Sequence, residues 1–156
     1  MIPIIEKLKS RISTLEEKSA ITGALITNYT ITTGISATTF ETIPVKNLIT
    51  SKGKAFSITE EGEILCNKNM QVICFANLVL HSLKATGGKQ LQIRIGQSIC
   101  SYTENDISNG YRNMQTTSII INVNKGDKIR IAYSGTAEDV VLGGFSYTTY
   151  LNVVEL

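Results

Sequence analysis

From residue 40 to the C-terminus, short apolar runs alternate with turn sequences, and this alternation limits the chain to few folds. Gly, Asn, Asp and Ser provide the turn signals, as in Asn109-Gly110 and Gly126-Asp127. No apolar repeat of helical period follows Lys18. Eight or nine short strands at such intervals predict a β-sandwich or a β-barrel. The expected strands span residues 42–49, 55–59, 63–66, 70–83, 91–95, 98–103, 116–123, 128–134 and 145–154.

The first 19 residues follow a different rule. Their apolar positions recur at spacings of four and three, at Met1, Ile5, Leu8, Ile12 and Leu15. This is the heptad repeat of a coiled coil, with Ile at a positions and Leu at d positions. Arg11 and Glu16 then occupy g and e positions, where ion pairs between chains form. Residues 1–19 are therefore predicted to form a coiled-coil stalk.

A helix this short is marginal by itself, so it needs a partner. Ile at a and Leu at d favour two chains, although two heptads are too few to impose that number on a trimeric head. The alternative is an amphipathic helix that packs on its own head. Residues 20–39 carry no charge and are rich in Ile, Thr, Gly and Ser, which predicts a β-rich connector or small β shoulder before a head of residues 40–156.

Two expected strands are apolar on both faces. In residues 72–80 both alternating sets are apolar apart from Asn77, and residues 119–121 are three isoleucines. A strand of an isolated sandwich exposes one face to water, so the second apolar face needs a cover. We expect a subunit interface there, with Ile73 and Phe75 joining Ile5, Leu8, Ile12 and Leu15 as oligomerisation residues.

Composition excludes several classes of function. The net charge is +2 without a basic cluster, so nucleic acid is not an expected partner. No stretch approaches the roughly 20 apolar residues that span a bilayer, and the charged N-terminus does not predict a cleaved signal peptide. The 3 cysteines lack a CxxC motif, which argues against a zinc site and a disulfide framework.

No catalytic motif stands out. The single histidine, His81, lies at the end of an apolar strand, where a structural role is the usual one. The turn containing Gly126 and Asp127 is interpreted as structural, because one carboxylate with one Asn is too little for a calcium site. We therefore expect no enzyme activity, no metal and no cofactor.

The order of motifs resembles the trimeric jelly-roll heads of the complement globular head and tumour necrosis factor family. It is most similar to the versions found in phage tail, baseplate and head-fibre proteins. The residues that carry the resemblance are 56–64, 70–78, 91–96, 118–131 and 149–156. Met70 and Val72 depart from the family's Gly and Tyr, and Gln97 replaces its usual turn residue. The resemblance implies an all-β jelly-roll sandwich that forms a homotrimer.

Recognition is expected from the longest polar segment, residues 102–115, interpreted as a loop. Aromatic faces stack on sugars or apolar patches, while Asn, Asp and Arg offer directional hydrogen bonds. The alternative is a soluble crossover loop without a ligand. The candidate ligand-binding residues are Tyr102, Asn105, Asp106, Asn109, Tyr111, Arg112 and Asn113.

Together these features predict a phage receptor-binding protein at a fibre or baseplate tip. Its head would bind a host cell-surface saccharide or protein, and its stalk would attach to other virion proteins. We expect it in the virion, acting outside the cell. The alternatives are a structural head that trimerises and caps a virion or spore-surface fibre, and, more remotely, a surface-glycan hydrolase.

Overall fold

The computed structural model describes residues 2–18, 21–25, 29–30, 40–45, 47–51, 54–81, 88–106, 112–134, 140–142 and 149–156. Helix α1 comes first in the chain, and every later element within these described ranges is a strand. The elements are α1 (Ile2–Lys18), β1 (Ile21–Leu25), β2 (Tyr29–Thr30), β3 (Glu41–Ile43), β4 (Asn47–Ser51), β5 (Phe56–Ile58), β6 (Ile64–Cys66), β7 (Met70–His81), β8 (Gly88–Ile95), β9 (Ser98–Asp106), β10 (Arg112–Val123), β11 (Lys128–Ser134), β12 (Val140–Leu142) and β13 (Tyr150–Glu155).

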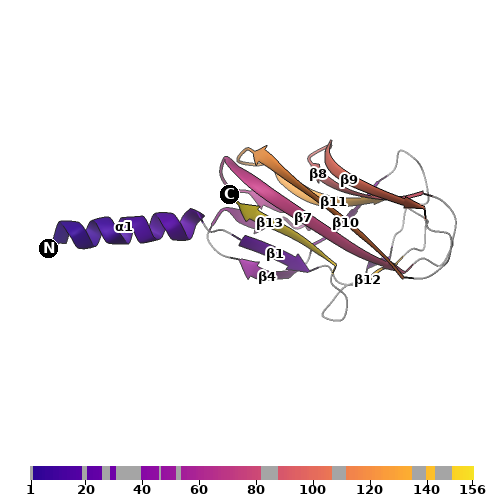
Figure 1. The fold of residues 1–156 in the computed structure, drawn as a ribbon, viewed down its shortest axis with the longest axis horizontal. Helices are drawn as coiled ribbons and strands as arrows, with labels where there is room; N and C mark the ends of the chain where they lie inside the picture. Colours follow the sequence, from indigo (N-terminus) through magenta and orange to yellow (C-terminus); the bar gives the residue numbers. More distant parts are fainter. Residues whose placement is uncertain are drawn as a thin grey trace.

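The predicted N-terminal helix is confirmed as α1. It points away from the strands along the long axis of the molecule (Figure 1). The side chains of Ile5, Leu8 and Ile12 are 49%, 50% and 54% exposed. These exposures contradict the alternative in which α1 buries its apolar stripe on the head of its own chain.

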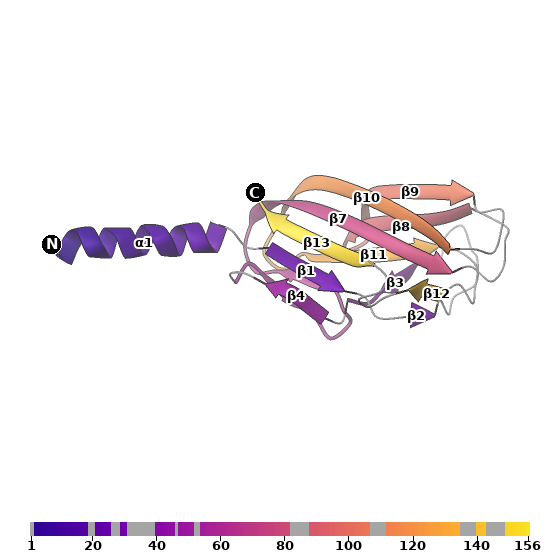
Figure 2. The same ribbon diagram turned by 60° about the horizontal axis from the view of Figure 1, so that its bottom comes forward.

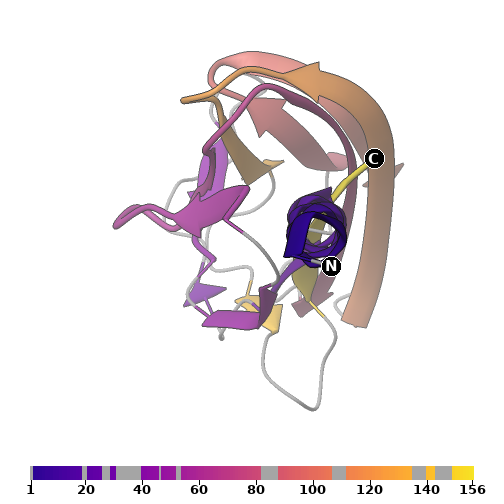
Figure 3. The ribbon, with the colours of Figure 1, turned by 90° about the vertical axis from the view of Figure 1, so that its left-hand side faces the viewer.

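The strands form two antiparallel sheets that face one another (Figure 2). Sheet A has the order β2-β12-β7-β13-β1-β4, with β10 paired to β7. Sheet B has the order β5-β6-β11-β8-β9, with β3 paired to β11. Viewed along α1, the sheets curve around a common interior (Figure 3). The expected β-sandwich is therefore present.

The core fills the space between the sheets and follows the two-residue period of the strands. On β7, Val72, Cys74, Ala76 and Leu78 all point inward and are at most 2% exposed. The facing residues of sheet B are contributed by β6, β8 and β11, namely Ile64, Leu91, Ile93, Ile129, Ile131 and Tyr133. Because these positions are set by alternation, the residues between them point to the outer side of each sheet.

Two segments illustrate how the chain divides between the sheets. The predicted strand 42–49 is two strands, because the chain changes sheets around Pro44, which has no backbone N–H to donate. β3 pairs with β11 in sheet B, whereas β4 pairs with β1 in sheet A. β1, from the segment predicted as a connector or shoulder, also pairs with β13 in sheet A.

Among the described residues, no helix combines the length and the apolar character that crossing a membrane requires.

Candidate functional site

The outer face of sheet A carries an apolar surface. Register aligns Ile120, Ile73 and Val154 across β10, β7 and β13, and the next row joins Ser118, Phe75 and Asn152. These rows lie on the side of the sheet opposite the core. We call this surface the sheet A face and define it by Ile73, Phe75, Met114, Ile120, Tyr150 and Val154.

Three of these side chains are strongly exposed: Phe75 at 40%, Met114 at 62% and Ile120 at 56%. An open hollow of about 280 Å³ lies beside Phe75, with Thr116, Ser118 and Tyr150 also in its lining. Exposed apolar groups that cluster on one sheet face mark a binding or assembly surface. The sheet A face includes β7 and β10, the strands whose sequences are apolar on both faces and predict a covered surface.

The predicted ligand segment is mostly strand instead of loop. β9 continues to Asp106 and β10 begins at Arg112, so only residues 107–111 separate them. Tyr102 lies on β9, 61% exposed, and its register partner on β8 is Gln92. Because Leu91 and Ile93 face the core, Gln92 and Tyr102 lie on the outer face of sheet B.

The remaining candidates are placed only in part. Asn105 and Asp106 end β9, whereas Arg112 and Asn113 begin β10 at the end of the head away from α1 (Figure 2). Asn109 and Tyr111 lie outside the described residues, as does the side chain of Leu15. The structure thus separates Tyr102 from Ile73 and Phe75, which occupy the opposite sheet.

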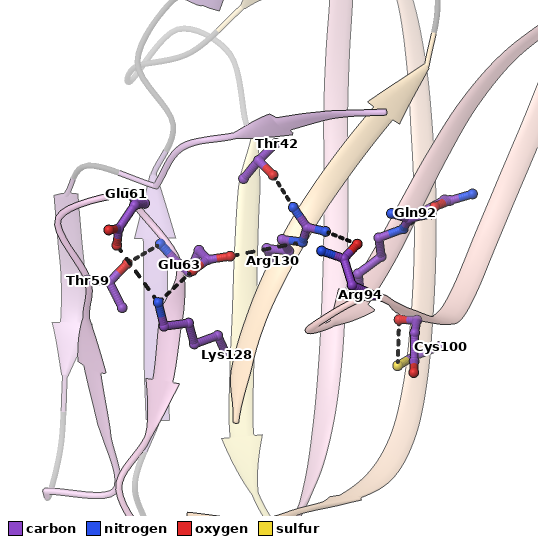
Figure 4. A network of polar contacts seen from close by, with 11 residues as sticks. Thr42, Thr59, Glu61, Glu63, Gln92, Arg94, Cys100, Lys128 and Arg130 are labelled. Atoms are coloured by element: carbon purple, nitrogen blue, oxygen red, sulfur yellow. Dashed lines mark hydrogen bonds and ion pairs between the residues drawn. The ribbon is translucent and has the colours of Figure 1, made fainter. Parts of the chain in front are cut away.

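The outer face of sheet B also holds a polar network that the sequence interpretation missed (Figure 4). Arg130 on β11 and Arg94 on β8 are register partners. Arg130 Nη1 donates to Thr42 Oγ1 at 2.6 Å, and its Nε lies 3.9 Å from Glu63 Oε1. The sequence signal was the alternation of Gln90, Gln92 and Arg94 with apolar residues, but the pairing with Arg130 depends on register alone.

Nucleophilic chemistry finds little support in the described residues. Burial raises the pKa values of the Cys66 and Cys74 thiols to about 12, so both stay protonated near neutral pH. No cluster of three His, Cys, Asp or Glu residues able to hold a metal occurs in the described part of the chain. The side chain of His81 lies outside that part.

The similarity of this chain to known proteins is a similarity of fold. No family model matches the sequence, and no curated protein matches it either. The crystal structure of murine APRIL at pH 5.0 superimposes with a TM-score of 0.66 at 12% identity, covering 89% of this chain and 100% of APRIL. The pH 8.5 structure gives 0.60 at 13% identity with the same coverage. The chain therefore has a jelly-roll sandwich that resembles the fold of the tumour necrosis factor family.

Proposed function

We propose that this chain is the non-enzymatic binding head of a homotrimeric phage tail, baseplate or fibre protein. The head attaches to a saccharide or protein of the host cell surface, and α1 joins it to other virion proteins. The observation that carries the proposal is the sheet A face, an uncovered apolar surface on a fold of the tumour necrosis factor type.

Energetics support self-association through that face. Fully burying a large apolar side chain contributes about 1.5–3 kcal/mol. Phe75, Met114 and Ile120 leave between 40% and 62% of their area in water, so each still has about 1 kcal/mol to contribute. Several such residues in every interface of a closed trimer would contribute to the stability of the assembly.

The α1 seam supports the same arrangement. Ile5, Leu8 and Ile12 are each about half exposed and recur at heptad spacing. A helix of 17 residues gains stability when such a stripe is buried against copies of itself. Three copies of the head would bring three helices together at one end, where they form a stalk around the same axis.

Adhesion is tested with labelled full-length protein on host cells. The proposal expects saturable binding that falls when Tyr102→Ala, Tyr111→Ala and Arg112→Ala are combined. Equal adhesion of this triple variant and the wild type would remove the assigned segment from the binding site. A trimer that binds none of the cells that its phage infects would instead support the second candidate function.

That second candidate is a structural head that trimerises and caps a fibre without binding the host. The favouring observation is that the two large uncovered apolar surfaces among the described residues, α1 and the sheet A face, are both accounted for by self-association.

A further inference from the structure

Two arginines face one another on the outer side of sheet B. Arg94 and Arg130 are direct register partners on adjacent strands, and the flanking Ile93 and Ile131 point into the core. Like charges in this position repel, which costs free energy unless an anion offsets them. Burial and the charge of Arg130 both lower the pKa of Arg94.

The nearby carboxylates are used by other cations. Glu63 lies 3.9 Å from Arg130 Nε and 3.3 Å from Lys128 Nζ, so two cations share it. Glu61 lies 4.0 Å from Lys128 Nζ. In the part of the chain that the structure describes, Arg94 forms no ion pair with a carboxylate.

Arg94 is nevertheless held in a fixed orientation. Its guanidinium carbon lies 4.9 Å from the ring centre of Phe40, a cation–π contact. Its Nε donates to Gln92 Oε1 at 2.6 Å. Gln92 donates in turn to Gln90, whose Nε2 donates to Glu104 Oε2 at 3.3 Å. These hydrogen bonds hold the Arg94 guanidinium through the side-chain amides of Gln92 and Gln90. The carboxylate of Glu104 lies at the end of this relay that is far from Arg94.

The two terminal nitrogens of Arg94 remain for a ligand. Among the described residues none accepts a hydrogen bond from them, and the side chain is only partly buried. A planar guanidinium with a free pair of donors matches the two oxygens of a carboxylate or phosphate group. Stacking and the relay reduce the entropy lost when such an anion binds.

We propose that Arg94, with Arg130 beside it, binds the oxyanion of an acidic cell-surface saccharide. The choice of a saccharide as its carrier rests on the proposed function. Exposed Tyr102, across from Gln92 in the register, offers an aromatic face for a sugar ring on the same side of the sheet. The oxyanion is the carboxylate of a uronic acid or the phosphate of a phosphodiester-linked polymer.

Calorimetric titration of the full chain tests the site. The probes are an oligogalacturonate for the carboxylate, an oligo(glycerol phosphate) for the phosphate, and neutral dextran as the control ligand. Arg94→Gln is compared with Lys125→Gln, which makes the same charge change at an exposed turn residue. Arg94→Lys keeps the positive charge but removes the planar guanidinium with its two terminal donors. Circular dichroism shows that each variant is folded.

The expected result is binding of one acidic probe and none of dextran, with the preferred probe identifying the oxyanion. Arg94→Gln should raise the Kd by about tenfold or more, Arg94→Lys should restore only part of the loss, and Lys125→Gln should leave the Kd unchanged. The site is wrong if neither acidic probe binds, or if Arg94→Gln and Lys125→Gln weaken binding equally.

Host-cell adhesion separates this proposal from the function on which it rests. Binding of an acidic probe that depends on Arg94, together with absent host adhesion, contradicts the adhesin function and retains the anion site. Host adhesion that persists at wild-type strength in Arg94→Gln contradicts the assignment of the site to host recognition and leaves the adhesin function standing.

Discussion

The hydroxyl of Thr103 on β9 donates a hydrogen bond to the backbone carbonyl of Thr116 on β10, at 2.5 Å. Ser101 repeats the contact one row along, donating to the carbonyl of Ser118 at 3.1 Å. β9 belongs to sheet B and β10 to sheet A, so side-chain hydroxyls link the two sheets at this edge. These contacts supply side-chain donors to two carbonyls of β10 beside β9, which protects this edge.

Thr103→Val is therefore expected to lower the free energy of unfolding by about 1 kcal/mol, because the shape is kept while the hydrogen bond is lost. Denaturant unfolding monitored by circular dichroism measures the change. Thr116→Val is the matched control, since it keeps the accepting carbonyl. If both variants are equally stable, the Thr103 hydroxyl contributes nothing to closing the edge.

A glycine contact gives a second prediction. Gly62 has a φ of 78°, and a Cβ added there would lie 2.7 Å from the Pro44 Cβ and from the backbone nitrogen of Val45. Val45 also donates its N–H to the Gly62 carbonyl at 2.9 Å. Gly62→Ala thus combines backbone strain with a clash against backbone atoms that cannot move freely, and it should destabilise the head by about 3 kcal/mol.

Gly126 supplies the comparison for Gly62. Its φ is 94°, but nothing lies within 4 Å of an added Cβ. Gly126→Ala should cost only the backbone strain, about 1 kcal/mol. Thermal unfolding of both variants measures the difference. Equal losses would mean that the approach of Pro44 and Val45 to Gly62 is not a tight contact.

Thiol reactivity tests whether Cys66 and Cys74 lie in the protein core. Desolvation by burial is the main cause that raises the pKa values of Cys66 and Cys74 to about 12. At pH 8 both should resist a thiolate-specific reagent in the folded protein, whereas the partly exposed Cys100 reacts faster. All 3 thiols should react in concentrated guanidinium chloride. Rapid modification of Cys74 in the folded protein would contradict its place in the core.

The same pKa shifts set a direction for alkaline stability. A thiol whose pKa is raised on folding stabilises the folded state in full at pH values below its ordinary pKa of 9.0. This stabilisation is lost as the pH rises through the folded-state pKa, which for Cys74 is about 12. Cys74→Ala should therefore lose less stability than the wild type over this interval, and Cys100→Ala serves as its comparison.

Much of the fold could be predicted from local patterns. Heptad spacing predicted α1, and the strand at residues 128–134 matches β11 because its alternation is regular and its turn is clear. Pro44 shows where such patterns fail: the chain changes sheets there, and sheet membership depends on partners distant in sequence. In the same way, β1 of the predicted connector or shoulder pairs with β4 and with β13, which is distant in sequence.

The site was less predictable than the fold. Residues 102–106 and 112–115 are largely polar, which favoured a loop, yet they complete β9 and β10 because edge strands accommodate polar side chains. Arg94 and Arg130 lie opposite one another because β8 pairs with β11. No local sequence signal predicts this pairing. By contrast, the outward position of Ile73 and Phe75 could be predicted from the sequence. The residues on both faces of their strand are apolar, and such a strand is expected to need a cover on each side.

The interface itself can be tested by charge. Ile120→Asp places a carboxylate in the sheet A face, where the side chain is 56% exposed, and should dissociate the assembly because burying an unpaired charge is costly. Ile99→Asp is the matched control, since Ile99 is 52% exposed but lies on β9 of sheet B. Sedimentation velocity at micromolar concentration compares the two. Loss of assembly in both variants, or in neither, would place the interface elsewhere.

The most direct test is the mass of the unmodified full chain in solution, measured by light scattering coupled to size-exclusion chromatography at micromolar concentration. The proposed architecture predicts a single species of three 17.0 kDa chains. A monomer would contradict it, because the sheet A face and the α1 seam would then both remain exposed to water.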